Sequence, residues 1–119
     1  MATILVVDDE PEILQFIGTA LEDEGHRVLK AADGWQAVDI AAQQRPDMIV
    51  LDMMLPGMDG DGVASEMRRI YGEDVPILLI TADGQAQQKA ERVGAFSHLS
   101  KPFDLDRLIG LVSTGLGSS

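Results

Sequence analysis

Residues 4–9 read ILVVDD, four aliphatic side chains followed directly by two aspartates. The same arrangement returns as MIVLD at residues 48–52 and as VPILLIT at residues 75–81. Runs of this length that are apolar at both odd and even positions are typical of strands buried on both faces of a sheet. Two weaker strands are expected over Arg27–Ala31 and around Ser97–Leu99. The sequence therefore predicts five strands.

Amphipathic helices are expected between and after these strands, because apolar residues recur there with helical spacing. In the first helix Pro11 suits the N1 position and Gly25 the C-terminal stop, and Asp104 suits the N-cap of the last helix. The expected apolar stripes are, in chain order, Ile13, Phe16, Ile17, Ala20 and Leu21; Trp35, Val38 and Ala42 after Asp33; Val63, Met67 and Ile70, ending near Gly72; Ala86, Ala90 and Val93, stopped by Gly94; and Leu105, Leu108, Ile109 and Val112. Five strand-then-helix units in alternation predict an α/β fold with a doubly wound parallel sheet.

The length and composition limit the class of protein. The 119 residues fit a single domain, residues 1–119, in which the Gly/Ser-rich stretch 113–119 is expected to fray or to begin a linker. The absence of cysteine excludes disulfides, thiolate metal sites and a cysteine nucleophile. A net charge of -11 opposes direct binding to nucleic acid or to anionic lipid. The N-terminus does not resemble a signal peptide and no apolar run reaches membrane-spanning length, so a cytoplasmic protein without membrane contact is expected.

Polar residues follow the predicted strands at the ends where doubly wound sheets bind their ligands. They are Asp8 and Asp9, then Asp52, then Thr81, with Lys101 just past the last strand. Each of them alone is compatible with an ordinary cap or turn role. Together they bring three carboxylates to one rim, where a cation must neutralise their repulsion, and oxygen ligands of this kind suit Mg²⁺. Lys101 adds a positive charge for a phosphate group or serves as a second counter-ion.

Four motifs then occur in order and without insertions: VVDDE at residues 6–10, D-x-x-x-P-G-M-D-G at 52–60, LLIT-A at 78–82 and GA-x-x-x-L-x-KPF at 94–103. Together they resemble the receiver domain of the response regulators of two-component signalling, over residue 3 to about residue 112. The resemblance implies a flavodoxin-like, five-stranded parallel sheet in the order 2-1-3-4-5 with five helices. It also implies a phosphorylation-dependent switch that catalyses its own phosphorylation and dephosphorylation, rather than an enzyme that turns over external substrates.

The resemblance assigns a role to each rim residue. Asp52 resembles the phosphoacceptor, and Asp9, Asp52 and the backbone carbonyl of Met54 resemble the direct Mg²⁺ ligands, with Asp8 holding the ion through water. Thr81 and Lys101 resemble the side chains that contact the phosphoryl oxygens, helped by the backbone N–H groups of Met53 and Ala82. The donor would be a histidine kinase or a histidine phosphotransfer protein. A cation and a lysine suit phosphoryl transfer physically, because both neutralise the transferring oxygens.

Two residues leave a choice open. His98 stands where the family usually has a Tyr or Phe that rotates inward on activation, and it is either such a switch, with a charge that depends on pH, or a surface histidine on an edge strand. Leu14 lies about 100° from the apolar stripe of the first helix. It is either a scattered surface residue or part of a docking face for the phosphodonor.

The output surface is expected to comprise the helix near residues 83–94, the strand near 97–99 and the last helix. Residues 83–94 carry little apolar surface and an early glycine, so this helix should be the least firmly held. After phosphorylation the Thr81 hydroxyl can pull the loop between Thr81 and this helix inward. Asp104–Leu116 contains only one basic residue, Arg107. A monomer or a weak phosphorylation-dependent dimer is therefore expected, with an effector that the sequence does not identify.

Three other readings compete with a switch. An Mg²⁺-dependent phosphatase of the haloacid-dehalogenase type also phosphorylates an aspartate, but it places D-x-D on its first strand, where this chain has adjacent Asp8 and Asp9. A receiver-like module that is never phosphorylated would usually lack one of the rim residues. A flavodoxin-like cofactor binder would have to bring a flavin phosphate against the acidic rim.

Overall fold

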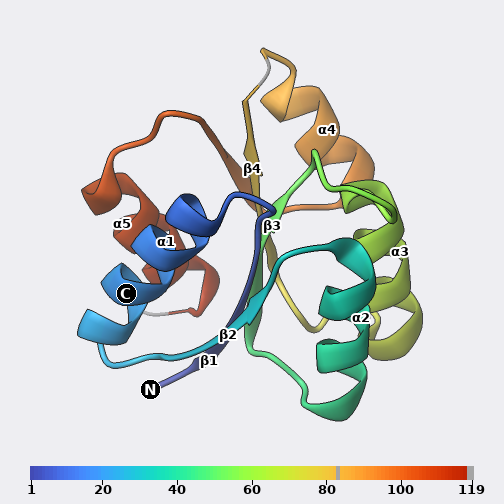
Figure 1. The fold of residues 1–119 in the computed structure, drawn as a ribbon, viewed down its shortest axis with the longest axis horizontal. Helices are drawn as coiled ribbons and strands as arrows, with labels where there is room; N and C mark the ends of the chain where they lie inside the picture. The colour runs from blue at the N-terminus through green and yellow to red at the C-terminus, as the bar shows by residue number, and fades with distance from the viewer. Residues whose placement is uncertain (83, 118–119) are drawn as a thin grey trace.

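The sheet predicted from the sequence is present in the structure, a computed structural model that describes residues 1–82 and 84–117. Its five strands are all parallel and lie in the order β2-β1-β3-β4-β5 (Figure 1). The bounds are Thr3–Val7 for β1, Arg27–Ala31 for β2, Met48–Asp52 for β3, Ile77–Thr81 for β4 and Ser97–Ser100 for β5. The flavodoxin-like order 2-1-3-4-5 is thereby confirmed.

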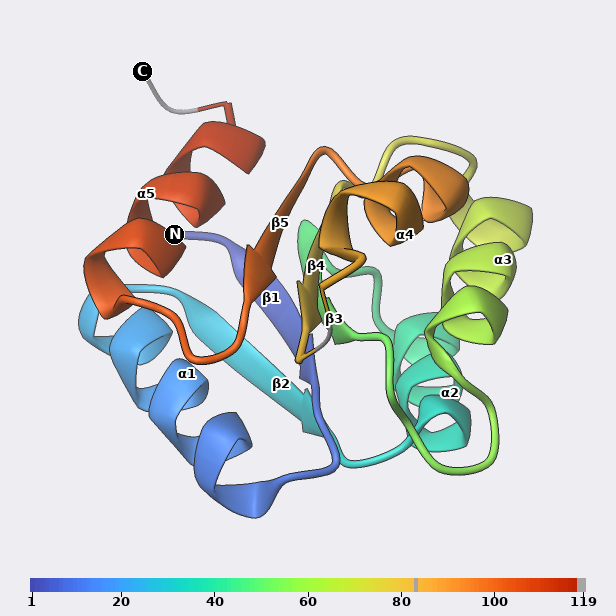
Figure 2. The ribbon, with the colours of Figure 1, turned by 90° about the horizontal axis from the view of Figure 1, so that it is seen from above.

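Five helices cover the two faces of the sheet (Figures 1 and 2). On one face lie α1 and α5, and on the other lie α2, α3 and α4. Their bounds are Pro11–Asp23 for α1, Gly34–Gln43 for α2, Gly60–Tyr71 for α3, Ala86–Val93 for α4 and Leu105–Gly115 for α5. Successive strand residues point to opposite faces, so β1 contributes Leu5 and Val7 to the core under α2–α4, and Ile4 and Val6 to the core under α1 and α5.

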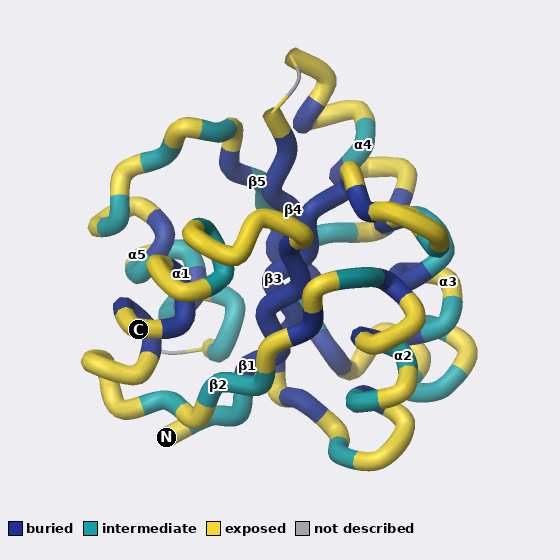
Figure 3. Tube along the Cα trace, viewed as in Figure 1, coloured by how far each residue is buried: buried dark blue, intermediate teal, exposed yellow. Residues whose placement is uncertain are grey.

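The central strands are buried along their length, whereas β2 is partly exposed at the edge (Figure 3). This explains why the aliphatic runs of β1, β3 and β4 have no polar alternation. Side chains cap three of the helices: Asp33, Asp59 and Asp104 each accept a hydrogen bond from a backbone N–H of the first turn. At the end of α4, Gly94 takes the left-handed conformation, with a φ of +72°.

Two of the expected apolar stripes are wrong in part. In α2 the buried residues are Gly34, Ala37 and Ala41, while Trp35 is 66% exposed and Ala42 also faces solvent. Small side chains let α2 approach the sheet closely. The neighbouring helix α3 packs beside α2, and the Tyr71 hydroxyl at its end donates a hydrogen bond to the Ala41 carbonyl at 2.6 Å. In α1, Phe16 is 46% exposed. The rest of the α1 stripe is confirmed, with Ile17, Ala20 and Leu21 in the core, so only α2 buries a different set of residues at helical spacing.

The C-terminal helix is longer than the sequence indicated. It continues to Gly115, so residues 113–115 are helical rather than frayed. Ser118 and Ser119, the end of the expected tail, lie outside the described residues, as does Asp83 at the expected start of the fourth helix, which begins at Ala86. No helix within residues 1–82 and 84–117 combines the length and the hydropathy needed to cross a bilayer.

Candidate functional site

The expected rim residues meet at the carboxyl ends of the strands. Asp8 directly follows β1, Asp52 and Thr81 are the last residues of β3 and β4, and Lys101 directly follows β5. The register aligns these ends, with Val7 opposite Leu51, Asp52 opposite Ile80, and Thr81 opposite Ser100. Asp8, Asp52 and Thr81 are the three buried polar or charged side chains of the described chain, at 1%, 2% and 0% exposure. Their burial sets them apart from ordinary surface carboxylates and hydroxyls.

Four carboxylates form one cluster at this rim. Asp8, Asp9, Glu10 and Asp52 each offer an oxygen, and these oxygens lie within 4.8 Å of one another. Three of the four were expected, and Glu10 was not. It enters because the chain turns tightly after β1, where the Glu10 N–H donates to Asp8 Oδ1 at 2.9 Å. The signal that could have identified Glu10 is its place directly after the aspartate pair.

Lys101 is the positive partner of this cluster. Its Nζ lies 2.9 Å from Asp8 Oδ2, 2.9 Å from Glu10 Oε1 and 3.1 Å from Asp52 Oδ2. The backbone of Lys101 is fixed as well, because its N–H donates to the Thr81 carbonyl at 2.9 Å. The bond from Lys101 to Pro102 is a cis peptide. One ammonium thus contacts three carboxylates, which leaves the cluster with an excess of negative charge.

The residues present fit a hard cation. Asp8 Oδ2 is buried and receives the Lys101 ammonium as an ion-pair partner, yet it accepts no well-aligned hydrogen bond from the described residues. An acceptor that is desolvated and incompletely satisfied is costly to keep in a fold. Carboxylate oxygens from two strand ends match the ligand preference of Mg²⁺, and one of them, Asp8 Oδ2, accepts no well-aligned hydrogen bond from the described residues.

The electrostatics of the site follow from burial and charge. Burial raises the pKa of Asp52 above its usual value, and the nearby Asp8 raises it further, while hydrogen bonds from Met54 and Lys101 lower it; the net direction is upward. Burial lowers the pKa of Lys101, but its contacts with Glu10, Asp8 and Asp52 outweigh burial and hold that pKa above its usual value. Lys101 therefore stays charged, and the charge on Asp52 is costly in the absence of a further cation.

The backbone amides that follow Asp52 have different partners. The Met53 N–H donates to the Ile80 carbonyl at 3.1 Å, continuing the pairing of β3 with β4, so it is engaged in the sheet. The Met54 N–H instead donates to Asp52 Oδ1 at 3.0 Å. The amide directed at Asp52 in this structure is therefore that of Met54, because alternate amides point to opposite sides of a strand. The role of the Met53 N–H toward a phosphoryl group stays a prediction. Ala82 is exposed beside Thr81, where its N–H remains a candidate donor.

An apolar groove opens next to the acid cluster. It has a volume of about 430 Å³ and is lined by Glu10, Ile13, Phe16, Ala82, Lys101, Pro102 and Phe103. The rings of Phe16 and Phe103 lie 6.4 Å apart and are tilted by 47°. Leu14, the expected docking residue, is half-buried and packs against the core under α1 and α5. Phe16 is thus the more accessible apolar side chain of α1 at this end. His98 is half-buried on β5, on the far side of Pro102 and Phe103, in a separate hollow near Arg107.

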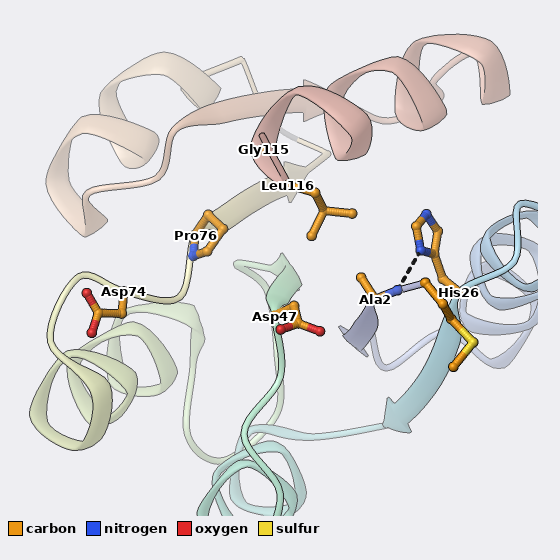
Figure 4. A pocket seen from close by; sticks show the side chains of 8 residues that line it. Ala2, His26, Asp47, Asp74, Pro76, Gly115 and Leu116 are labelled. Atoms are coloured by element: carbon orange, nitrogen blue, oxygen red, sulfur yellow. Dashed lines mark hydrogen bonds between the residues drawn. The ribbon is translucent and has the colours of Figure 1, made fainter. Parts of the chain in front are cut away.

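Another hollow, of about 450 Å³, lies at the opposite end of the sheet (Figure 4). Ala2, His26, Asp47 and Pro76 line it, and each directly precedes a strand. Hydrogen bonds from Ala2 N–H to His26 Nδ1 at 3.3 Å and from Thr3 N–H to Asp47 Oδ2 at 2.7 Å show that these side chains tie strand ends together. None of the rim residues reaches this hollow, which we interpret as structural.

Comparison with known proteins decides the family. The family model for the response regulator receiver domain matches residues 4–113. The chain belongs to the response regulator receiver family. Sporulation initiation phosphotransferase F of Bacillus subtilis is 37% identical over 107 residues, which cover 88% of this chain and 86% of that protein. The receiver family consists of signalling switches rather than typical enzymes on external substrates, which removes the phosphatase and flavin-binder alternatives at the level of family.

Two further relatives bear on the receiver domain. The transcriptional regulator RpaA of Synechocystis is 40% identical over 115 residues, 94% of this chain, but the chain spans only 48% of that protein. The structure of response regulator TrrA of Thermotoga maritima, solved in complex with Mg²⁺–BeF, superposes on this chain with a TM-score of 0.87 at 32% sequence identity. The match covers 97% of this chain and 99% of TrrA. The receiver domain is thus similar both to proteins of its own length and to parts of longer regulators.

Proposed function

We propose that this receiver domain is a phosphorylation-dependent switch in which Asp52 accepts a phosphoryl group from a phosphohistidine. The observation that carries the proposal is the environment of Asp52, which is buried at the end of β3 inside the acid cluster and within 3.1 Å of the Lys101 ammonium. The donor would be a histidine kinase or a histidine phosphotransfer protein.

The residues of the site divide the work of the transfer. One carboxylate oxygen of Asp52 forms a bond to phosphorus as the phosphorus–nitrogen bond of the donor imidazole breaks. The electron pair of that bond stays on the ring nitrogen. The released imidazole is neutral if its other nitrogen carries a proton, and otherwise takes up a proton from solvent. The Met54 N–H and the Lys101 ammonium fix the orientation of the carboxylate. Lys101 already lies beside Asp52, so it is placed to contact oxygens attached there. The Thr81 hydroxyl and the Ala82 N–H would contact the remaining phosphoryl oxygens.

The acid cluster would hold Mg²⁺ through Asp9, Asp52 and the Met54 carbonyl, with Asp8 acting through water. When bound, the ion neutralises the carboxylates and the charge on the transferring oxygens. Asp8 Oδ2 has no partner among the described residues other than the Lys101 ammonium, so a water molecule bound to the ion could donate to it. The Mg²⁺–BeF complex of the relative TrrA supports the same ligand chemistry in this chain by similarity.

Phosphorylation would be transmitted through Thr81 to the surface formed by α4, β5 and α5. Thr81 ends β4, and its carbonyl is bonded to Lys101, so one residue links the strand end to the loop before α5. The first helix of that surface, α4, has only Ala86, Ala90 and Val93 buried, and two of these are small. His98, on β5, remains a candidate second switch residue, and the effector that reads this surface is not identified.

The apolar groove between α1 and the loop after β5 would receive the phosphodonor. It adjoins Lys101 and Glu10, and Ile13, Phe16, Pro102 and Phe103 offer an apolar surface to a helix of the donor. Leu14 would contribute only its exposed part.

Phosphotransfer between proteins tests the proposal. A histidine phosphotransfer protein carrying radiolabelled phosphohistidine should pass its label to this receiver domain in Mg²⁺ and not in EDTA. The Phe16→Ala variant should be labelled more slowly by the protein donor but at the wild-type rate by acetyl phosphate. Equal labelling of Asp52→Asn would contradict the assignment of the acceptor.

A further inference from the structure

The surface on the other side of Asp52 carries two unusually exposed apolar side chains. Trp35, in the first turn of α2, is 66% exposed, and Met54, in the loop after β3, is 61% exposed. A single exposed apolar residue is ordinary in a soluble protein, but a contiguous group of them is typical of an interaction surface.

The loop between β3 and α3 passes the start of α2 (Figures 1 and 2), and two close approaches join this loop to α2. A Cβ on Gly57 would lie 3.2 Å from the indole Cδ1 and Nε1 of Trp35, so the indole rests on the loop backbone. A Cβ on Gly34 would overlap the Met58 carbonyl oxygen. We call Trp35, Pro56, Gly57 and Met58 the Trp35 surface; Met58 is half-buried and the other three are exposed.

The Trp35 surface lies among chain segments that carry an excess of negative charge. The three segments around it, residues 8–12, 32–39 and 52–62, contain no lysine or arginine. Basic side chains from elsewhere in the described chain also contact these segments: Lys101 is bound within the acid cluster, and Arg92 makes a two-bond ion pair with Asp61. Their carboxylates are Asp8, Asp9, Glu10, Glu12, Asp33, Asp39, Asp52, Asp59 and Asp61.

We propose that the Trp35 surface is a docking site for a basic, apolar peptide segment of a protein partner, separate from the groove beside Phe16. An exposed tryptophan supplies the large rigid contact area on which protein interfaces depend most strongly. The surrounding carboxylates select lysine- and arginine-flanked segments and speed their association, while they repel nucleic acid and acidic peptides.

Two synthetic helix-forming peptides test the charge and the apolar character of the site, one built of leucine and lysine and the other with glutamate in place of lysine. Trp35 is the only tryptophan, so its fluorescence reports on this surface alone. The lysine peptide should shift the emission to the blue and move the backbone amide signals of residues 33–39 and 53–59. The glutamate peptide should do neither. The protein is used without Mg²⁺ or phosphodonor, so the result does not depend on whether Asp52 is phosphorylated.

Matched variants then locate the contact by calorimetry. Trp35→Ala should lower the affinity for the lysine peptide at least tenfold, and Trp35→Lys should lower it further. Phe16→Ala, which removes another exposed aromatic ring, should bind the lysine peptide with the affinity of the wild type. Equal affinity in Trp35→Ala, or a loss confined to Phe16→Ala, would overturn the proposal. So would a dimer of the wild type, seen by sedimentation and abolished by Trp35→Ala, because a second copy would then occupy the surface.

Discussion

Lys101 and Glu10, 91 residues apart in the chain, are joined by a 2.9 Å contact between Nζ and Oε1 at the mouth of the acid cluster. The same ammonium also contacts the carboxylates of the buried Asp8 and Asp52. Lys101 is thus the main neutralising group of the cluster, and its removal would leave two buried carboxylates facing each other.

We expect Lys101→Met to destabilise the protein in EDTA by about 2–4 kcal/mol, because it leaves buried charges without their partner. Glu10→Gln should cost less than about 1 kcal/mol, since Glu10 is exposed and gains little from a surface ion pair. Urea unfolding measures both. Mg²⁺ should restore part of the loss in Lys101→Met, and equal, small effects of the two substitutions would contradict this role for Lys101.

We expect Asp52→Asn to be more stable than the wild type in EDTA at pH 7. The pKa of Asp52 is raised in the folded state, so as pH rises the carboxyl ionises first in the unfolded chain, and the charge then opposes folding. The advantage of the asparagine variant should be complete above the folded-state pKa and should vanish below the unfolded value of about 3.9. Thermal melts at pH 3.5 and pH 7 measure this, and a less stable variant at pH 7 would contradict the direction.

Mg²⁺ should raise the melting temperature of the wild type by binding preferentially to the folded state. At a free concentration 100-fold above its Kd, such binding contributes about 2.7 kcal/mol. Asp9→Asn should blunt the gain, because it removes a ligand, whereas Asp39→Asn, an exposed carboxylate on α2, should leave it unchanged. No shift of the wild type in millimolar Mg²⁺ would exclude the metal site as assigned.

Much of the site followed from the sequence, because parallel strands bring their carboxyl ends to one edge whatever the details of packing. This rule alone predicts that Asp8, Asp52, Thr81 and Lys101 lie together. Glu10 did not follow, since its part in the cluster depends on the turn after β1 and on the reach of Lys101.

The remaining differences arise where local periodicity admits two answers. Trp35 and Phe16 both fit a helical stripe, yet the structure exposes both, because alanines and half-buried neighbours fill the facing surface instead. Met53 and Met54 are the same residue type at neighbouring positions, so their backbone amides point to opposite sides of the strand. Because the Met53 N–H is bonded to the Ile80 carbonyl, the Met54 N–H points to Asp52. Tertiary contacts of this kind leave no mark in the spacing of residues.

We expect Thr81→Ala to accept phosphate at Asp52 but to transmit it poorly. Charge-assisted hydrogen bonds contribute about 1.5–3 kcal/mol, enough to shift a two-state equilibrium about tenfold to a hundredfold. The measurement is the set of backbone amide shifts over residues 84–112, with and without a beryllofluoride phosphate mimic. Thr81→Ser keeps the hydroxyl and should respond like the wild type. Wild-type shifts in Thr81→Ala would show that the coupling runs elsewhere, with His98 as the next residue to examine.

The acceptor role of Asp52 is tested most directly by intact-mass spectrometry after incubation with acetyl phosphate, which needs no protein partner. We predict a gain of one phosphoryl group in the wild type with Mg²⁺, no gain in EDTA, and no gain in Asp52→Asn under either condition. Hydroxylamine should remove the added mass, as it does from acyl phosphates. A phosphoryl group gained equally by Asp52→Asn, or by the wild type without any divalent cation, would contradict the account.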